Sequence, residues 1–553
     1  MTRYHILITL GLLGLGQART PTCRCFPDEP CWPSPEEWDA FNHTIGGRLI
    51  RTTPISSVCH TNTSFNTYNA RSCSELLTNW EDPRTHYDTS SSPMAAWFGN
   101  YSCTPFSPPC TLGPLVRYAV KVSNVDDVRA TLNFTTTHNI RLVIRNTGHD
   151  YLGKSTGAGA VALWTHHLTH TQTIPDYTSA VYSGPALRLG AGVQGSQALS
   201  AAQSSNHTLV TGNCPSVGIA GGYTQGGGHG QLVSLYGLAA DQVLEWEVVT
   251  ATGDWLVASS TQHEDLFWAL SGGGGGTYAV VMSVLVKMYP ELRTVEARLA
   301  VSSTVPGYWD VVGAALVDTM PLVDRGGVVV WNLGREGFSL APVALPGGTV
   351  DMLQGYLGRT LELLKRKNVT YEYTINTHST FYKSYQATNP HLNITDYQIG
   401  GRLLPRSTID NNPSLLPTFQ EIVAFNTSIA GVSLNVSRGR WPSNAVNPVW
   451  REAGMAVVLG LPYSRVRETD LQRQVVMTNE LVPRLEALAP GSGAYLNEAD
   501  FNEPDWRRVF YGVNYQRLLA VKEKYDPFQV FYGLTAVGSE GWVVSGDGRL
   551  CRV

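Results

Sequence analysis

Two residues that could take part in covalent chemistry, His149 and Cys214, stand in unusual surroundings. His149 lies in the segment RNTGHDY, and Cys214 lies in TGNCPSVGIAGGYTQGGGHG, a glycine-rich stretch over residues 211–230. Glycine permits positive φ angles and lets backbone amides approach a ligand closely. Successive N–H groups in such turns form concavities that attract anions such as phosphates. The stretch therefore predicts a binding surface made of backbone, with a thiol inside it as a nucleophile or attachment point.

Three other chemical motifs are less informative. The run from Gly190 to Gly195, GAGVQG, has the form G-x-G-x-x-G, but no acidic residue follows about 20 positions later to bind a ribose. A tight strand–helix turn is therefore favoured there. His166 and His170 have a spacing that binds zinc on a helix, but the segment is expected to be a loop and contains no H-E-x-x-H, so no metal site is predicted. The absence of a G-x-S-x-G motif argues against a serine hydrolase.

The nine cysteines are distributed very unevenly. Seven lie within the first 110 residues and one lies close to the C-terminus, and these eight could form four disulfides in an oxidising compartment. Their pairing stays open. Cys214 is then the odd cysteine, which in a secreted protein needs an explanation. The other eight are Cys23, Cys25, Cys31, Cys59, Cys73, Cys103, Cys110 and Cys551.

The N-terminus has the layout of a secretory signal peptide over residues 1–18. Arg3 precedes an apolar run from Ile6 to Leu15, and small residues follow it at a plausible cleavage site. No later segment approaches the ~18 consecutive apolar residues of a membrane span. Nine Asn-X-Ser/Thr sequons fit a glycosylated surface, so we expect a protein that is secreted or lies in the lumen of the secretory pathway. The sequons begin at Asn42, Asn62, Asn100, Asn133, Asn206, Asn368, Asn393, Asn426 and Asn435.

The 553 residues are expected to form two or three domains. A net charge of −4 argues against nucleic acid or an anionic membrane as the main partner. Residues 19–110 are rich in Cys, Pro, Ser and Thr and show little periodicity, which predicts a disulfide-stapled extension packed on the main body.

The elements that must position the two residues begin after this extension. A helix is predicted over 124–138, because Asn124 is followed by an acidic first turn. The apolar run 141–145 predicts a buried strand that leads directly into the His149 segment. Further predicted elements are a strand over 186–192, a hairpin over 243–258 turning at 252–254, a strand over 277–289, and helices over 470–488 and 505–525.

Together, TGHDY, GNCPSVG, GGYTQGGGHG and LFWALSGGGGGTYAVV resemble the flavin-binding domain of the vanillyl-alcohol oxidase superfamily. With FYGVNYQRLLAVKEKYDPFQVFYG near the C-terminus, the chain is similar to the berberine bridge enzyme-like branch over most of residues 110–545. The resemblance implies an α+β fold. Its parts would be a PCMH-type FAD-binding domain of two subdomains over 111–291, an α/β substrate domain with an antiparallel sheet over 292–500, and a C-terminal segment over 501–545 that returns to the FAD domain.

The resemblance also implies a bicovalent cofactor. FAD would be attached to His149 through its 8α-methyl group and to Cys214 through C6, which would account for the unpaired cysteine. Val217 matches the position that controls oxygen access, where a valine resembles the oxidase members. Asn514 resembles an asparagine near the pyrimidine end of the flavin. The other implied cofactor-binding residues are Asn146, Thr147, Gly148, Asp150, Tyr151, Gly218, Gly221, Gly222, Tyr223 and Asp241.

Candidates for the catalytic base come from a second segment. AYLNE resembles the family's Y-x-N-Y stretch, which makes Tyr495 the first choice as base and Glu498 the second. The loop after Cys214 is one residue longer than in plant members, so Tyr223 takes the place of their histidine and His229 the place of their tyrosine. His229 has either a polar or basic role or merely fills space.

These features predict a secreted FAD-dependent oxidase that removes a proton and a hydride from an alcohol or amine carbon of a small molecule and reduces O2 to H2O2. A specialised metabolite is the favoured substrate, because the Cys-rich leader resembles fungal members. A carbohydrate oxidase is the alternative, and a non-catalytic flavin- or glycan-binding protein is the hypothesis from another class. A monomer is expected. Aromatic side chains that could stack on either substrate are Trp331, Tyr371, Tyr373 and Tyr382.

Overall fold

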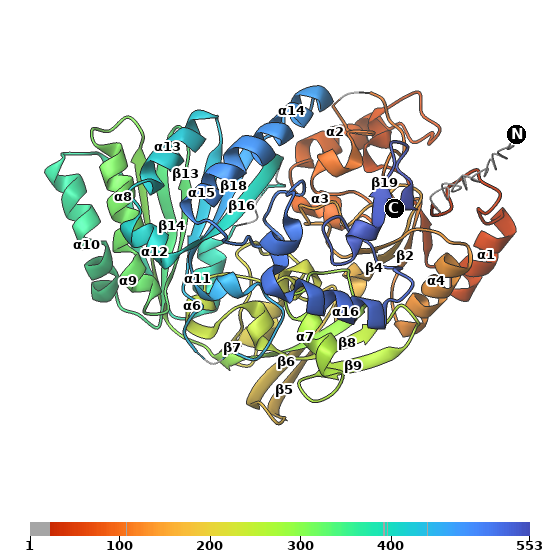
Figure 1. The fold of residues 1–553 in the computed structure, drawn as a ribbon, viewed down its shortest axis with the longest axis horizontal. Coiled ribbons are helices and arrows are strands. Elements are labelled where there is room, and N and C mark those ends of the chain that lie inside the picture. The colour runs from red at the N-terminus through yellow and green to blue at the C-terminus, as the bar shows by residue number, and fades with distance from the viewer. Residues whose placement is uncertain (1–22, 107, 391–392, 395, 440) are drawn as a thin grey trace, which may run out of the picture.

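The computed structural model describes residues 23–106, 108–390, 393–394, 396–439 and 441–553. The predicted signal peptide lies outside these residues. Two of the sheets belong to the region predicted to bind FAD, and a third, larger sheet forms the region predicted to bind substrate. Figure 1 shows this larger sheet with its helices on the left of the molecule and the other two sheets below and to the right.

The strand that precedes His149 belongs to a four-stranded sheet of order β1-β2-β4-β3. The strands β2, β4 and β3 are parallel, and β1 from the extension joins β2 antiparallel. The predicted helix and strand are confirmed: Asn124 caps α4, and β3 leads to the His149 segment. The bounds are β1 (Leu49–Arg51), β2 (Tyr118–Lys121), α4 (Val125–Thr137), β3 (Leu142–Arg145) and β4 (Val161–Trp164).

A five-stranded antiparallel sheet of order β5-β6-β10-β8-β9 forms the second subdomain. The predicted hairpin is confirmed as β8 and β9, and the GAGVQG run is a strand–helix turn from β6 to α5 as predicted. His166 lies in a 3₁₀ turn rather than a helix, so it does not share a helix face with His170. The bounds are β5 (Thr171–Thr178), β6 (Ser183–Gly190), α5 (Gly195–Gln203), β8 (Val243–Val249), β9 (Trp255–Ser259) and β10 (Val280–Lys287).

The third sheet has seven antiparallel strands in the order β15-β12-β14-β13-β17-β18-β16 and a hydrophobic core of its own with the helices α8, α10, α13 and α15. The bounds of its strands are β12 (Thr294–Ser302), β13 (Val328–Leu333), β14 (Gly337–Pro346), β15 (Tyr371–His378), β16 (Tyr397–Pro405), β17 (Ser428–Ser433) and β18 (Ala453–Pro462). The bounds of its helices are α8 (Tyr308–Asp318), α10 (Val350–Arg366), α13 (Leu415–Ala424), α14 (Arg467–Val476) and α15 (Val482–Leu488).

Trp331 belongs to this core. Its side chain is fully buried, and its indole N–H donates to Ser433 Oγ at 3.2 Å. The interpretation of Trp331 as a residue that stacks on a substrate is therefore wrong. An alternating strand pattern does not reveal which of its two faces is packed against helices.

The C-terminal segment differs from the prediction at one point. A single helix was expected over 505–525, but the helix α16 (Tyr515–Tyr525) begins only after a break at Gly512. Gly512 has φ +57°, a left-handed conformation that interrupts a right-handed helix. The break turns the Asn514 side chain toward the carbonyls of Ala445 and Val446, to which it donates at 3.3 and 3.1 Å.

The remaining elements are short helices and two small antiparallel sheets, one of β7 with β11 and one of β19 with β20. The helices are α1 (Pro35–Thr44), α2 (Ala70–Asn79), α3 (Pro83–Tyr87), α6 (Val233–Tyr236), α7 (Glu264–Leu270), α9 (Met320–Val323), α11 (Phe381–Thr388) and α12 (Arg406–Asn411). The strands are β7 (His207–Thr208), β11 (Tyr289–Pro290), β19 (Trp542–Val544) and β20 (Leu550–Arg552). Within the described ranges, no helix has the length and apolar character needed to cross a membrane.

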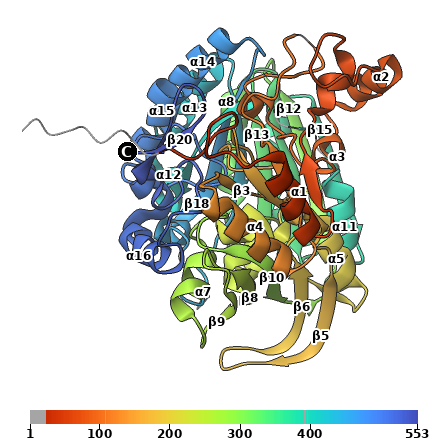
Figure 2. The ribbon, with the colours of Figure 1, turned by 90° about the vertical axis from the view of Figure 1, so that its right-hand side faces the viewer.

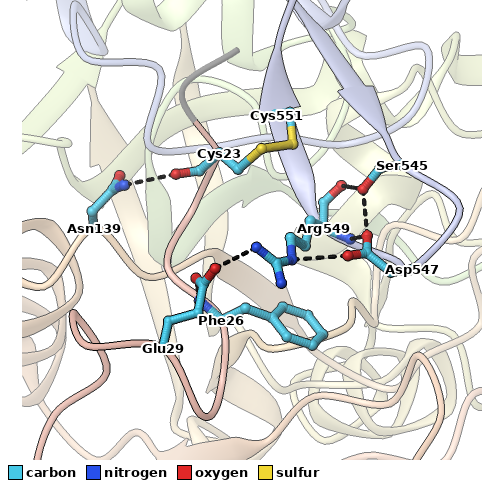
Figure 3. Close-up of a disulfide and its surroundings, with 8 residues drawn as sticks. All are labelled: Cys23, Phe26, Glu29, Asn139, Ser545, Asp547, Arg549 and Cys551. Carbon is cyan, nitrogen blue, oxygen red and sulfur yellow. Dashed lines mark hydrogen bonds and ion pairs between the residues drawn. A yellow bond between two sulfur atoms is a disulfide. The ribbon is translucent and has the colours of Figure 1, made fainter. Parts of the chain in front are cut away.

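One disulfide joins the extension to the end of the chain, and three lie within the extension. Cys23 pairs with Cys551, which places the dark-blue C-terminal segment beside the red N-terminal elements (Figures 1 and 2). In Figure 3 the Arg549 side chain lies next to this disulfide and forms an ion pair with Glu29. The other pairs are Cys25–Cys31, Cys59–Cys73 and Cys103–Cys110. The four disulfides confirm the predicted use of eight cysteines, and Cys214 is free.

Candidate functional site

A tight turn after β3 presents His149. The Asp150 carboxylate accepts backbone N–H groups from Leu152, Lys154 and Ser155 at 3.2, 2.6 and 3.2 Å. An ionised carboxylate that accepts several amides is a strong local anchor. Asp150 therefore fixes the backbone of the turn that follows His149. Of the neighbours, Thr147 is buried and Tyr151 is half-buried.

His149 and Cys214 meet at one hydroxyl group. The Oγ of Ser216, which is almost fully buried, lies 2.8 Å from His149 Nε2 and 3.6 Å from Cys214 Sγ. Both side chains are half-buried, so each keeps access to the space in front of it. The structure thus brings together the two residues that were predicted to share one ligand, although 65 residues separate them in the sequence.

The surroundings of His149 keep its ring neutral. Desolvation lowers the pKa of His149 to about 3, and the electrostatic effects of the nearby His86 and Arg145 side chains lower it further. A neutral imidazole has one ring nitrogen with a free lone pair, which bond formation to an electrophilic carbon requires. At neutral pH the side chain is therefore ready to act as a nucleophile.

The glycines lie against Asn146 and form a cradle that side chains would fill. Asn146 Nδ2 donates to the Ala191 carbonyl at 2.7 Å, while its Oδ1 is buried and has no partner among the described residues. A Cβ on Gly218 would overlap the Asn146 amide, and one on Gly221 would lie 3.5 Å from it. Gly222 is exposed and is approached by the second glycine-rich segment, where a Cβ on Gly275 would lie 2.9 Å from its Cα.

This donor set fits FAD. The unpaired Asn146 oxygen suits a ring N–H, the bare backbone admits a flat ring system, and the paired His149 and Cys214 offer two attachment atoms. Val217 is half-buried three positions after Cys214, and its carbonyl accepts the Gly195 N–H at 2.9 Å. The assignment of individual residues to parts of FAD remains a prediction.

A second cluster of functional groups lies where the glycine-rich segment meets the seven-stranded sheet. His229 Nε2 lies 3.1 Å from Glu498 Oε2, and His229 Nδ1 is buried without a partner among the described residues. The rings of Tyr495 and Trp450 are 5.2 and 5.9 Å from the imidazole. The structure therefore brings the three predicted catalytic residues, His229, Tyr495 and Glu498, together. Trp450 packs against the rings of His229 and Tyr495 at one side of this cluster.

Tyr495 is held in its protonated form. Burial and the neighbouring Glu498 carboxyl raise the pKa of Tyr495 above its usual range. Its hydroxyl oxygen accepts the Asn497 amide at 2.8 Å, and the same amide donates to the Gly222 carbonyl at 2.6 Å. This pKa direction opposes the role of base for Tyr495, but Asn497 links its hydroxyl to the glycine cradle.

Tyr223 packs between two parts of the glycine-rich stretch. Its ring lies against Gly212 and Gly228, its hydroxyl is buried without a partner among the described residues, and burial raises its pKa well above 10. Tyr385 of α11 donates to the Gly212 carbonyl at 2.9 Å, so the substrate region also contacts the segment around Cys214. Both tyrosines therefore remain hydrogen-bond donors.

Asp241 is engaged by protein groups. Arg451 donates to both of its carboxylate oxygens at 2.7 and 2.9 Å, and Asn444 and the Leu238 N–H donate at 2.6 and 2.9 Å. These bonds tie the glycine-rich region to the substrate region. Asp241 thus anchors one region to the other, and its contact with the cofactor stays a prediction.

Several residues of the site were missed in the sequence. Ser216 and Asn497 lie inside the motifs GNCPSVG and AYLNE, so their place in these motifs could have identified them as site residues. Arg145, Tyr385 and Trp450 lie in ordinary buried strand and helix patterns, which give no local sign of a site.

Two family models match the chain. One is described as an FAD binding domain and matches residues 116–259. The other is described as berberine and berberine like and matches residues 494–537. The first range contains the turn of His149 and the glycine cradle, and the second contains Tyr495 and Glu498.

Relatives match nearly the whole chain. The FAD-linked oxidoreductase sor8 of Hypocrea jecorina is 46% identical over 543 residues, covering 96% of this chain and 93% of that protein. The VAO-type flavoprotein oxidase VAO615 of Thermothelomyces thermophilus is 40% identical and covers 96% of each chain. The crystal structure of the VAO-type flavoprotein MtVAO615 from Myceliophthora thermophila C1 superposes with a TM-score of 0.92 at 39% identity, covering 96% of this chain and all of that one.

A more distant structure shares the fold alone. The glucooligosaccharide oxidase from Acremonium strictum, described with a 6-S-cysteinyl, 8α-N1-histidyl FAD, superposes with a TM-score of 0.61 at 17% identity. It covers 77% of this chain and 92% of its own.

Proposed function

Because the chain belongs to the berberine bridge enzyme-like branch of the FAD-linked oxidoreductases, we propose that it is an oxidase whose FAD is linked to both His149 and Cys214. The observation that carries the proposal is the meeting of these two side chains at the Ser216 hydroxyl, beside the glycine cradle. The double linkage described for the distant glucooligosaccharide oxidase supports it. The substrate is proposed to be an alcohol or amine carbon of a specialised metabolite.

The chain's own groups would divide the chemistry between them. FAD, when bound, would supply the hydride acceptor and the redox chemistry with O2. The His229–Glu498 pair would take the proton from the substrate, because these groups lie 3.1 Å apart and His229 keeps one ring nitrogen without a partner among the described residues. Tyr495, which stays protonated, would donate a hydrogen bond that orients the substrate oxygen or nitrogen.

The oxidase reaction is tested by reoxidation of the flavin. We expect the photoreduced protein to recover its oxidised spectrum rapidly on mixing with air and to form one H2O2 per flavin, because Val217, at the position that resembles the family's oxygen gate, has a small side chain. Val217→Leu enlarges this side chain and is expected to slow reoxidation by about tenfold or more, while Val181→Leu, an exposed position in the β5–β6 turn, leaves it unchanged. Sluggish reoxidation of the unaltered protein would favour a dehydrogenase or a flavin-binding protein without turnover.

The alternative function is a carbohydrate oxidase. Tyr371, Tyr373 and Tyr382 are half-buried, so their rings could stack on a sugar as well as on a polycyclic metabolite. The same peroxide measurement with glucose, cello-oligosaccharides and chitooligosaccharides discriminates between them. Rapid turnover of any of these sugars would replace the metabolite proposal.

We further propose that the protein is secreted and glycosylated. Four disulfides fit an oxidising compartment, and the asparagine is exposed in seven of the nine sequons. Asn435 is half-buried, and its Nδ2 donates to Asp324 at 2.8 Å, so we expect this sequon to stay unmodified. The mature chain should start near Arg19 and migrate as a diffuse band until deglycosylated, and peptide mapping should find Asn435 bare. A sharp band that does not shift, with residues 1–18 still present, contradicts secretion.

A further inference from the structure

Arg145, at the end of β3, is an unusual buried charge. Its side chain is fully buried, and one terminal nitrogen, Nη2, donates to three backbone carbonyls. These belong to His86, Thr89 and Ser92 of the extension, at 3.1, 3.2 and 2.7 Å. Its Nε and Nη1 have no partner among the described residues. Asp150 is the carboxylate that stabilises this charge, but it forms no ion pair with Arg145 among those of the described residues. Burying a guanidinium without such a pair is costly, so the fold must gain something else from it.

The other side of the guanidinium faces the turn that carries His149. Gly148 has φ +82°, and a Cβ built on it would lie 2.7 Å from Arg145 Nη1. The Met94 N–H of the extension donates to the Gly148 carbonyl at 3.4 Å. Arg145 is therefore enclosed between the extension and the residue immediately before His149.

The extension is itself well anchored at this place. The buried ring of His86 lies 2.7 Å from the Trp80 carbonyl and 2.9 Å from Ser92 Oγ, and burial lowers its pKa to about 4, so it is neutral at pH 7. Further along, Phe98 packs against Phe501 with ring centroids 5.4 Å apart. The three carbonyls that Arg145 contacts thus belong to a fixed platform.

We propose that Arg145 is a positioning residue that clamps the His149 turn onto residues 80–94, so that the Cys-rich extension is part of the flavin attachment site. The inference rests on the proposed linkage through His149. Arg145 acts through the turn and not on the cofactor. Its three hydrogen bonds hold the end of β3 to the extension, and the Met94 N–H holds the Gly148 carbonyl to the same extension. The turn between these two attachments sets where the imidazole of His149 points. Cys214 lies on a separate segment and does not depend on this clamp.

The test is a peptide map of the purified, secreted protein, which reports flavin on His149 and on Cys214 separately. In Arg145→Met we expect flavin on the His149 peptide to fall by about tenfold or more, while the Cys214 peptide stays as in the unaltered protein. Arg141→Met is the matched control, because Arg141 is also buried, lies just before the same strand and contacts Tyr532 instead. It should leave both peptides modified.

A second variant guards against loss of folding. Gly148→Ala keeps the positive charge of Arg145 but forces the turn away from it, so flavin should again be lost from the His149 peptide alone. Arg145→Lys should retain part of the flavin on the His149 peptide that Arg145→Met loses. Equal loss from both peptides, or full modification of His149 in Arg145→Met, overturns the inference and leaves the proposed oxidase intact. An unaltered protein without flavin on His149 overturns both.

Discussion

The double variant His149→Ala/Cys214→Ala is expected to release all of its FAD on acid precipitation, whereas each single variant keeps a yellow pellet. A single covalent bond survives denaturation of the protein, but the amide cradle and ring contacts do not. Absorbance of pellet and supernatant measures the outcome directly. The absorption band should shift only when Cys214 is replaced, because a sulfur on the ring perturbs its π-system.

Turnover should fall in both single variants, because loss of either bond loosens the position of the reacting atoms and lowers the oxidising power of the flavin. His166→Ala is a suitable control, since His166 lies in the neighbouring 3₁₀ turn and has no contact with Cys214 or Ser216 among the interactions described. A colourless pellet from the unaltered protein would contradict the double linkage and remove the explanation for the free cysteine.

Replacement of the His229–Glu498 pair should have the second large effect. Glu498→Gln or His229→Asn is expected to lower kcat/KM by about 10²–10⁴-fold, the usual contribution of a positioned acid or base. The two losses should not add in the double variant, because the residues lie 3.1 Å apart and act as one unit. Tyr397→Phe, an exposed tyrosine at the start of β16, serves as the control.

The pH profile separates the pair from Tyr495. Since burial and Glu498 raise the pKa of Tyr495, its proton stays on throughout the working range. Tyr495→Phe should therefore lower the rate and leave the pH of half-maximal activity unchanged. A shift of that pH in Tyr495→Phe would identify Tyr495 as the base after all.

Much of the fold follows from local patterns. The Asn124 cap, the apolar run before His149 and the turn of the β8–β9 hairpin depend on residues within a few positions of one another, and all three are confirmed. The prediction of a single helix over 505–525 was wrong, because it also relied on a local pattern. Its amphipathic period continues through Gly512, and periodicity does not encode the left-handed φ angle that breaks it.

The sequence by itself determined the chemistry of the site: one free cysteine inside a glycine-rich stretch and one histidine after a strand, because residue types and short spacings are local properties. Only the tertiary structure decided the contacts. His229 and Glu498 are 269 residues apart, and Arg145 reaches carbonyls 53–59 residues away. Such pairs depend on which faces of sheets and loops pack together and on how far burial shifts a pKa, as for Tyr495. Neither property can be read from a neighbourhood of a few residues.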